Sequence, residues 1–88
     1  MNKTFTIGDE MGLHARPATV IVNTAGKFSS DITLMYKDKS INLKSIMGLM
    51  SLGVPHKAEI TITAEGSDAE EALTALEKTF LEQKLTSN

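Results

Sequence analysis

The chain has 88 residues, which is enough for one domain with a modest hydrophobic core and too few for two. A formal net charge of −2, with no run of lysine or arginine, argues against broad affinity for nucleic acid. The sequence contains no cysteine and only two histidines, so we expect no disulfide, no thiolate chemistry and no metal site.

The first elements are a strand and a helix joined by a loop. Residues Lys3–Ile7 alternate apolar and polar side chains, which predicts a strand, and Gly8–Leu13 forms the loop. Pro17 suits the first turn of a helix, because its missing N–H would have no partner there. We predict this helix over about Arg16–Lys27, with a buried stripe of Ala18, Ile21, Val22 and Ala25.

His14 falls at the junction between that loop and the helix. Helix N-termini attract anions through unpaired N–H groups and the positive end of the dipole, and Arg16 adds a planar set of donors. An imidazole beside an anion-binding site suggests a histidine that carries a phosphoryl group. A capping or solvent-exposed histidine is an equally good interpretation of these residues alone.

Two further strands follow, over Ile32–Tyr36 and around Ile41–Leu43. The short segment Lys37-Asp38-Lys39 between them predicts a hairpin. It has no glycine; Asp38 can tolerate a left-handed conformation, and the turn type is left open.

Ser45 is a favoured N-cap for a short helix over Ile46–Leu52, which Gly53 closes. A two-turn helix lying on a sheet cannot bury apolar side chains on every side. Part of the set must therefore be exposed, and a methionine-rich exposed surface suggests a docking patch. The set is Ile46, Met47, Leu49, Met50 and Leu52.

The last part of the chain contains a turn, a strand and a helix. His56 is expected to be a solvated residue of the turn at 54–57, and a strand follows over Ile60–Ala64. Ser67 to Glu70 reads as a capping box, and Thr86 to Asn88 is expected to fray. The final helix should bury Ala69, Ala72, Leu73, Leu76 and Phe80.

The order strand, helix, strand, strand, helix, strand, helix predicts an α+β, two-layer, open-faced β-sandwich. Helices should cover one face of the sheet, and the threonine-rich other face should meet water. Periodicity alone fixes only the hairpin pairing.

Two blocks of sequence resemble one known family. Gly-Leu-His-Ala-Arg-Pro-Ala at 12–18 resembles the active-site motif of HPr, the histidine-containing phosphocarrier of the bacterial sugar phosphotransferase system. The block 43–53 resembles the regulatory segment of HPr from low-GC Gram-positive bacteria, at the family's spacing. The resemblance covers nearly the whole chain, so it implies a single HPr-like domain over residues 1–88 and a four-stranded antiparallel sheet of order 1-4-2-3 with three helices on one face. Many relatives carry glycine in the 37–39 turn and near Lys57, where this chain does not.

The resemblance also implies a function. His14 would accept a phosphoryl group on Nδ1 from phosphorylated enzyme I, itself charged by phosphoenolpyruvate, and pass it to IIA domains of sugar permeases. Arg16 and the amides of Ala15 and Arg16 would hold the phosphate, since Pro17 has no N–H to give. Such a protein is a phosphoryl carrier rather than an enzyme, and it needs no cofactor.

Regulation is implied at Ser45, through an HPr kinase/phosphorylase and a CcpA-type repressor for which the seryl-phosphorylated form is corepressor. The expected partner-docking residues are Thr19, Val20, Ile46, Met47 and Met50. A regulator of the same fold working only through Ser45 and a nitrogen-branch carrier are the alternatives. With no apolar run of about 20 residues and no signal peptide, we expect a cytoplasmic monomer without membrane insertion.

Overall fold

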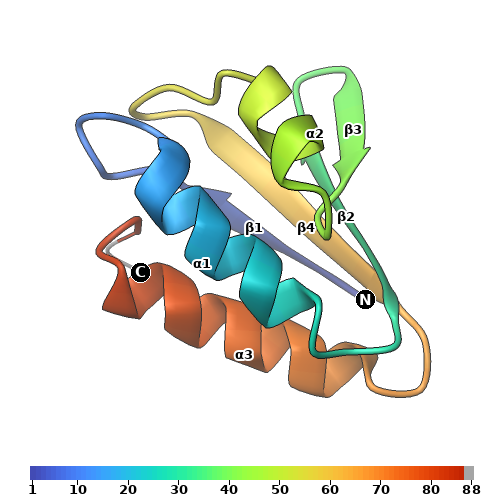
Figure 1. Ribbon diagram of the computed structural model, residues 1–88. Helices are drawn as coiled ribbons and strands as arrows, with labels where there is room; N and C mark the ends of the chain where they lie inside the picture. The colour runs from blue at the N-terminus through green and yellow to red at the C-terminus, as the bar shows by residue number, and fades with distance from the viewer. Residues whose placement is uncertain (87–88) are drawn as a thin grey trace.

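The computed structural model describes residues 1–86, which form a four-stranded antiparallel sheet with all three helices on one face (Figure 1). The strand order is β1-β4-β2-β3, so the predicted α+β class and the implied order are both confirmed. The strands are β1 (Asn2–Thr6), β2 (Asp31–Tyr36), β3 (Lys39–Asn42) and β4 (Glu59–Glu65). The helices are α1 (Ala15–Ala25), α2 (Ile46–Ser51) and α3 (Ala69–Glu82).

The pairing of the strands joins segments that are far apart in the sequence. β4 runs between β1 and β2, with Thr6 opposite Glu59 in one pair and Leu34 opposite Ile62 in the other. β2 and β3 form the predicted hairpin. The alternation of side chains along these strands therefore gives the sheet one apolar face and one polar face.

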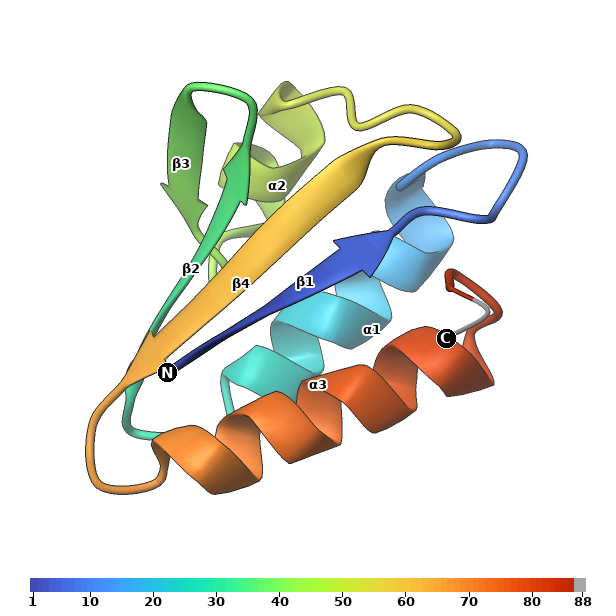
Figure 2. The same ribbon diagram turned by 180° about the vertical axis from the view of Figure 1, so that it is seen from behind.

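The apolar face packs on α1 and α3 and forms the core. Phe5 of β1 stacks on Phe80 of α3, with ring centroids 4.8 Å apart. The predicted stripe of α3 is buried throughout, whereas Val22 on α1 is only half-buried. The opposite face is open and lies toward the viewer in Figure 2. It carries threonines such as Thr4 and Thr61, whose hydroxyl oxygens are 3.1 Å apart, as the alternation predicted.

The predicted capping box at the start of α3 is wrong. Asp68 is the N-cap residue, and its side chain makes no capping hydrogen bond. Its carboxylate instead accepts hydrogen bonds from the amides of Ser29 and Ser30, at 2.9 and 3.0 Å. It also accepts hydrogen bonds from the hydroxyl groups of the same two serines. These bonds, that from the Ser30 hydroxyl foremost, lower the pKa of Asp68 from 3.8 to about 2. Asp68 thus ties the connection between α1 and β2 to the start of α3.

The turns that lack the expected glycine keep a left-handed backbone. Lys37 has a φ of 57° and Lys57 a φ of 72°, so Lys37 rather than Asp38 takes the left-handed position in the hairpin turn. Side chains with a Cβ rarely adopt this conformation, which costs them about 1–2 kcal/mol. At both turns lysine therefore adopts the left-handed backbone conformation that glycine adopts more easily.

A third lysine closes α3. Lys84 has a φ of 58°, and the amides of Lys84 and Leu85 donate to the carbonyls of Leu81 and Phe80, the pattern of a Schellman motif. The carbonyl of Leu85 in turn accepts the amide of Gly8 at 2.7 Å, so the end of α3 holds the start of the loop before α1. The expectation of fraying is wrong for Thr86, which is buried, and Ser87 and Asn88 lie outside the described residues.

Candidate functional site

The loop before α1 is held so that His14 reaches the first turn of the helix. Gly12 has a φ of +69°, and a Cβ at this position would lie 2.3 Å from the carbonyl oxygen of Val54. Only glycine allows this close approach of two backbone segments. The next residue, Leu13, is buried and donates its amide to the same oxygen at 2.9 Å. The segment that follows α2 therefore anchors the residue immediately before His14.

His14 is the N-cap residue of α1, but its ring does not cap the helix. Its backbone is extended, and its carbonyl accepts the amide of Ala18 at 3.1 Å, the first turn of the helix. The side chain is 31% exposed. Because the first N–H groups of a helix have no intrahelical partner, the amides of Ala15 and Arg16 remain as donors at the start of α1. Pro17 has no N–H, so it adds no further donor at this end of the helix.

Asp9, which no sequence motif pointed to, lies next to His14. Oδ2 of Asp9 is 3.6 Å from Nε2 of His14. Oδ1 accepts the amide of Met11 at 2.8 Å, an Asx turn that fixes the carboxylate. An aspartate in a loop is a local signal for such a turn, because its carboxylate readily accepts the backbone amide two residues on. Asp9 itself lies outside the motif block at 12–18.

The remaining residues predicted around His14 lie on α1. Arg16 and Thr19 are exposed, and Val20 is half-buried. Thr19 donates its hydroxyl to the carbonyl of Ala15 at 2.9 Å, and Arg16 forms no ion pair within residues 1–86. The guanidinium is therefore available to an incoming anion.

The short helix α2 lies beside α1 (Figure 1) and buries Leu49 against the core. The predicted docking residues on it are exposed: Met47 by 81%, Met50 by 39% and Ile46 by 38%. The hydroxyl oxygen of Ser45 accepts the amide of Gly48 at 3.0 Å, which confirms Ser45 as the N-cap. Ser45 is itself exposed beside this apolar surface.

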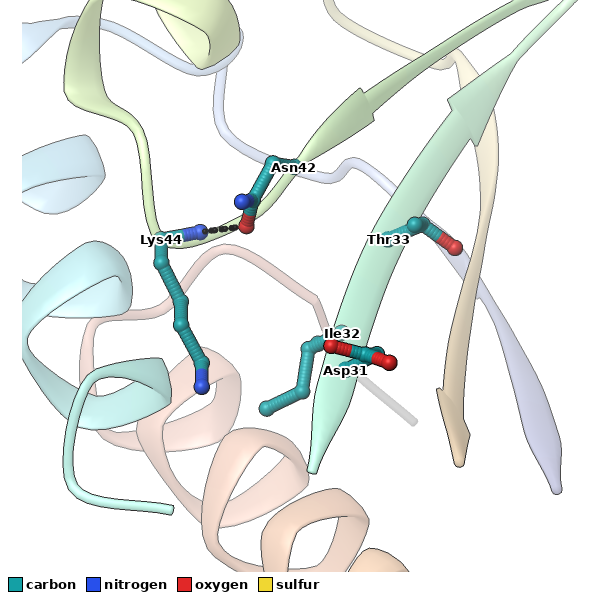
Figure 3. A pocket seen from close by; sticks show the side chains of 5 residues that line it. All are labelled: Asp31, Ile32, Thr33, Asn42 and Lys44. Carbon is teal, nitrogen blue, oxygen red and sulfur yellow. Dashed lines mark hydrogen bonds between the residues drawn. The ribbon is translucent and has the colours of Figure 1, made fainter. Parts of the chain in front are cut away.

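Two other features lie away from the predicted site residues. His56 is exposed in its turn, as expected. A hollow of about 200 Å³ is lined by Asp31, Ile32, Thr33, Asn42 and Lys44, whose side chains are drawn in Figure 3. The ammonium of Lys44 donates a hydrogen bond to the carbonyl of Phe28 at 2.7 Å. Across residues 1–86, no group of three histidine or carboxylate side chains could hold a metal ion, and no helix is both long and apolar enough to cross a membrane.

The sequence matches the family model for the PTS HPr component phosphorylation site over residues 1–82. The chain belongs to the HPr family of the phosphotransferase system. The family is one of phosphocarriers, so the resemblance seen in the motifs is confirmed.

Solved structures agree with this HPr assignment. The histidine-containing phosphocarrier protein of a Mycoplasma is 42% identical, with full coverage of both chains and a TM-score of 0.98. HPr from Bacillus anthracis is 47% identical over 90% of this chain and 94% of its own, with a TM-score of 0.83. Crh, the catabolite repression protein of Bacillus subtilis, is 45% identical over 85% and 86% of the two chains, with a TM-score of 0.74, and forms a domain-swapped dimer.

Proposed function

We propose that His14 is the phosphorylated residue of this HPr-family chain, accepting a phosphoryl group from phosphorylated enzyme I and donating it to IIA domains of sugar permeases. The observation that carries the proposal is the half-exposed His14 ring, free of any capping role, at the start of α1. In this role residues 1–88 form one carrier domain, which acts as a monomer in the cytoplasm. The domain does not by itself catalyse a reaction of a small-molecule substrate.

The transfer is a displacement at phosphorus. The lone pair of Nδ1 of His14 forms a new N–P bond while the N–P bond on the donor's phosphohistidine breaks, and that electron pair returns to the donor's ring nitrogen. The amides of Ala15 and Arg16 and the Arg16 guanidinium neutralise the equatorial oxygens during the transfer. The chain contributes positioning and electrostatic stabilisation, which suits a group that must later be handed on.

We further propose that Ser45 is the site of regulatory phosphorylation by an HPr kinase/phosphorylase. The side chain is exposed and already points at the amide of Gly48, so an added dianion would meet helix N–H groups and the fold would be retained. Its charge would lie beside the exposed Ile46, Met47 and Met50. A partner that buries this surface would then be weakened, and a CcpA-type repressor offering basic groups would be gained.

The docking surface for enzyme I and the IIA domains comprises Thr19, Val20, Ile46, Met47 and Met50. The large exposed fraction of Met47 supports it, because an isolated soluble domain gains nothing from such exposure. A Crh-like regulator working only through Ser45 is the second candidate, favoured by the similarity to Crh. The intact block around His14 favours the carrier.

The deciding experiment is incubation with enzyme I and labelled phosphoenolpyruvate. We expect acid-labile, base-stable label on the wild type and none on His14→Ala. His56→Ala is the matched control, because it removes the other histidine from an exposed turn and should leave the label unchanged. Full labelling of His14→Ala would refute the assignment, and a wild type that takes no label would favour the regulator.

A further inference from the structure

We infer that Asp9 is a positioning residue for His14, holding the imidazole in the tautomer that has its proton on Nε2 and its lone pair on Nδ1. The inference rests on the proposed function, in which Nδ1 of His14 receives the phosphoryl group. It concerns how this chain prepares the ring.

The carboxylate of Asp9 has little freedom to turn away. Oδ1 is engaged by the amide of Met11 at 2.8 Å, and the main-chain oxygen of Asp9 accepts the amide of Gly12 at 2.9 Å. The Asp9 side chain is 24% exposed. Only Oδ2 is left to face the histidine.

The ends of this loop are equally fixed. On one side, Ile7 exchanges backbone hydrogen bonds with Lys57 and Ala58, at 2.7 and 2.8 Å. On the other side, Gly12 and Leu13 lie against Val54. The fold therefore fixes the Asp9 carboxylate, whose Oδ2 lies 3.6 Å from Nε2 of His14.

A carboxylate can only accept hydrogen bonds, so it favours the tautomer that turns an N–H toward it. A neutral imidazole carries one proton, and a proton held on Nε2 leaves Nδ1 with its lone pair. At 3.6 Å the contact is longer than a hydrogen bond, and it acts as a directed electrostatic attraction that can shorten when a partner closes over the site.

The same contact favours the product of transfer. When Nδ1 forms its bond to phosphorus and Nε2 keeps its proton, the ring becomes a cation. The nearby carboxylate of Asp9 offsets that charge from the side of the ring opposite the phosphorus. Asp9 thus assists the reaction without touching the phosphoryl group.

The test uses Asp9→Asn, Asp9→Ala and a matched control, Glu10→Gln. In Asp9→Asn the amide oxygen can keep the hydrogen bond from Met11, which turns the NH₂ group toward Nε2 as a donor and favours the wrong tautomer. Asp9→Ala removes the preference without reversing it. Glu10→Gln removes one negative charge from the next, exposed residue of the same loop.

The tautomer is read directly from the ¹⁵N shifts of the His14 ring at a pH where it is neutral. We expect Nε2–H to dominate in the wild type and in Glu10→Gln, and to fall in Asp9→Asn. Phosphoryl transfer from enzyme I should slow about tenfold or more in Asp9→Asn, less in Asp9→Ala, and by less than about twofold in Glu10→Gln. The isosteric substitution Asp9→Asn should therefore slow transfer more than Asp9→Ala does.

Unchanged ring shifts in Asp9→Asn, or transfer in Asp9→Asn at least as fast as in Asp9→Ala, would overturn the inference. The NMR measurement requires no phosphoryl transfer, so it tests Asp9 even if enzyme I fails to phosphorylate the wild type. That failure would count against the proposed function alone.

Discussion

Replacing Lys57 by glycine should make the protein more stable. Lys57 has a φ of 72°, a conformation that costs a residue with a Cβ about 1–2 kcal/mol. Its amide donates to the carbonyl of Ile7 at 2.7 Å, so the backbone is held and cannot relax away from this angle. The side chain is exposed and forms no ion pair within residues 1–86, so its removal breaks no such contact.

The gain is the relief of strain minus the greater flexibility of glycine in the unfolded chain, which is about 0.5–1 kcal/mol. The free energy of unfolding should therefore rise by about 0–1.5 kcal/mol, and the midpoint of about 0.75 kcal/mol raises Tm by about 3–6 °C in a domain of this size. Thermal and denaturant unfolding followed by circular dichroism measure both quantities.

Lys27→Gly is the matched control for this prediction. Lys27 is an exposed lysine in a turn, and it is not among the residues with positive φ. Glycine there relieves no strain and should lower the free energy of unfolding by up to about 1 kcal/mol. If Lys57→Gly lowers stability as Lys27→Gly does, the left-handed conformation is not the source of strain that we take it to be.

Four other outcomes are expected. Because its pKa is lowered in the folded protein, the Asp68 carboxylate stabilises the fold above pH 3.8, and this contribution is lost as the pH falls toward 2. The loss of stability in Asp68→Asn, measured against the wild type, should therefore shrink between pH 4 and pH 2. A loss of stability that stays constant over this range would contradict the hydrogen bonds as the cause of the lowered pKa. Ser45→Asp should label more slowly than Ser45→Ala in the enzyme I assay, and equal rates would rule out repulsion at the docking surface. Met47→Asp should weaken binding of enzyme I in an NMR titration, whereas Met35→Asp, on the exposed open face, should not; equal effects would place the docking surface elsewhere. Arg16→Lys should slow transfer and Arg16→Ala slow it further, with stability changed by less than about 0.5 kcal/mol, and undiminished transfer in Arg16→Ala would remove Arg16 from the site.

Most elements of the fold follow from local sequence. Alternation along the strands and the spacing of apolar residues on α1 and α3 reflect burial on one side, which is a local property of each segment. The cap at Ser45 is equally local, because donor and acceptor are three residues apart. The strand order is different, since it depends on which strands meet, and periodicity carries no such information.

Two wrong predictions and the omission of Asp9 share one cause. The segment from Ser67 to Glu70 has the local pattern of a capping box. The serines that actually bind the Asp68 carboxylate lie 38 and 39 residues away, so the local pattern gives no sign of them. Lys37 takes a backbone angle that its residue type disfavours, because the pairing of β2 with β3 imposes it. Asp9 lies outside the motif at 12–18, and its proximity to His14 arises only once the loop is folded. In each case a tertiary contact outweighs a local preference.

The pairing of β1 with β4 has a consequence for how the chain is made. Thr6 lies opposite Glu59, so during synthesis β1 has no partner in the sheet until 53 further residues have been added. At translation rates of about 5–20 residues per second, that interval lasts about 3–10 s. Hairpins form within microseconds, so β2 and β3 can pair long before this. During the interval the apolar side chains of Phe5 and Ile7 lack the core residues that bury them in the folded protein, so this segment of the nascent chain is open to chaperone binding.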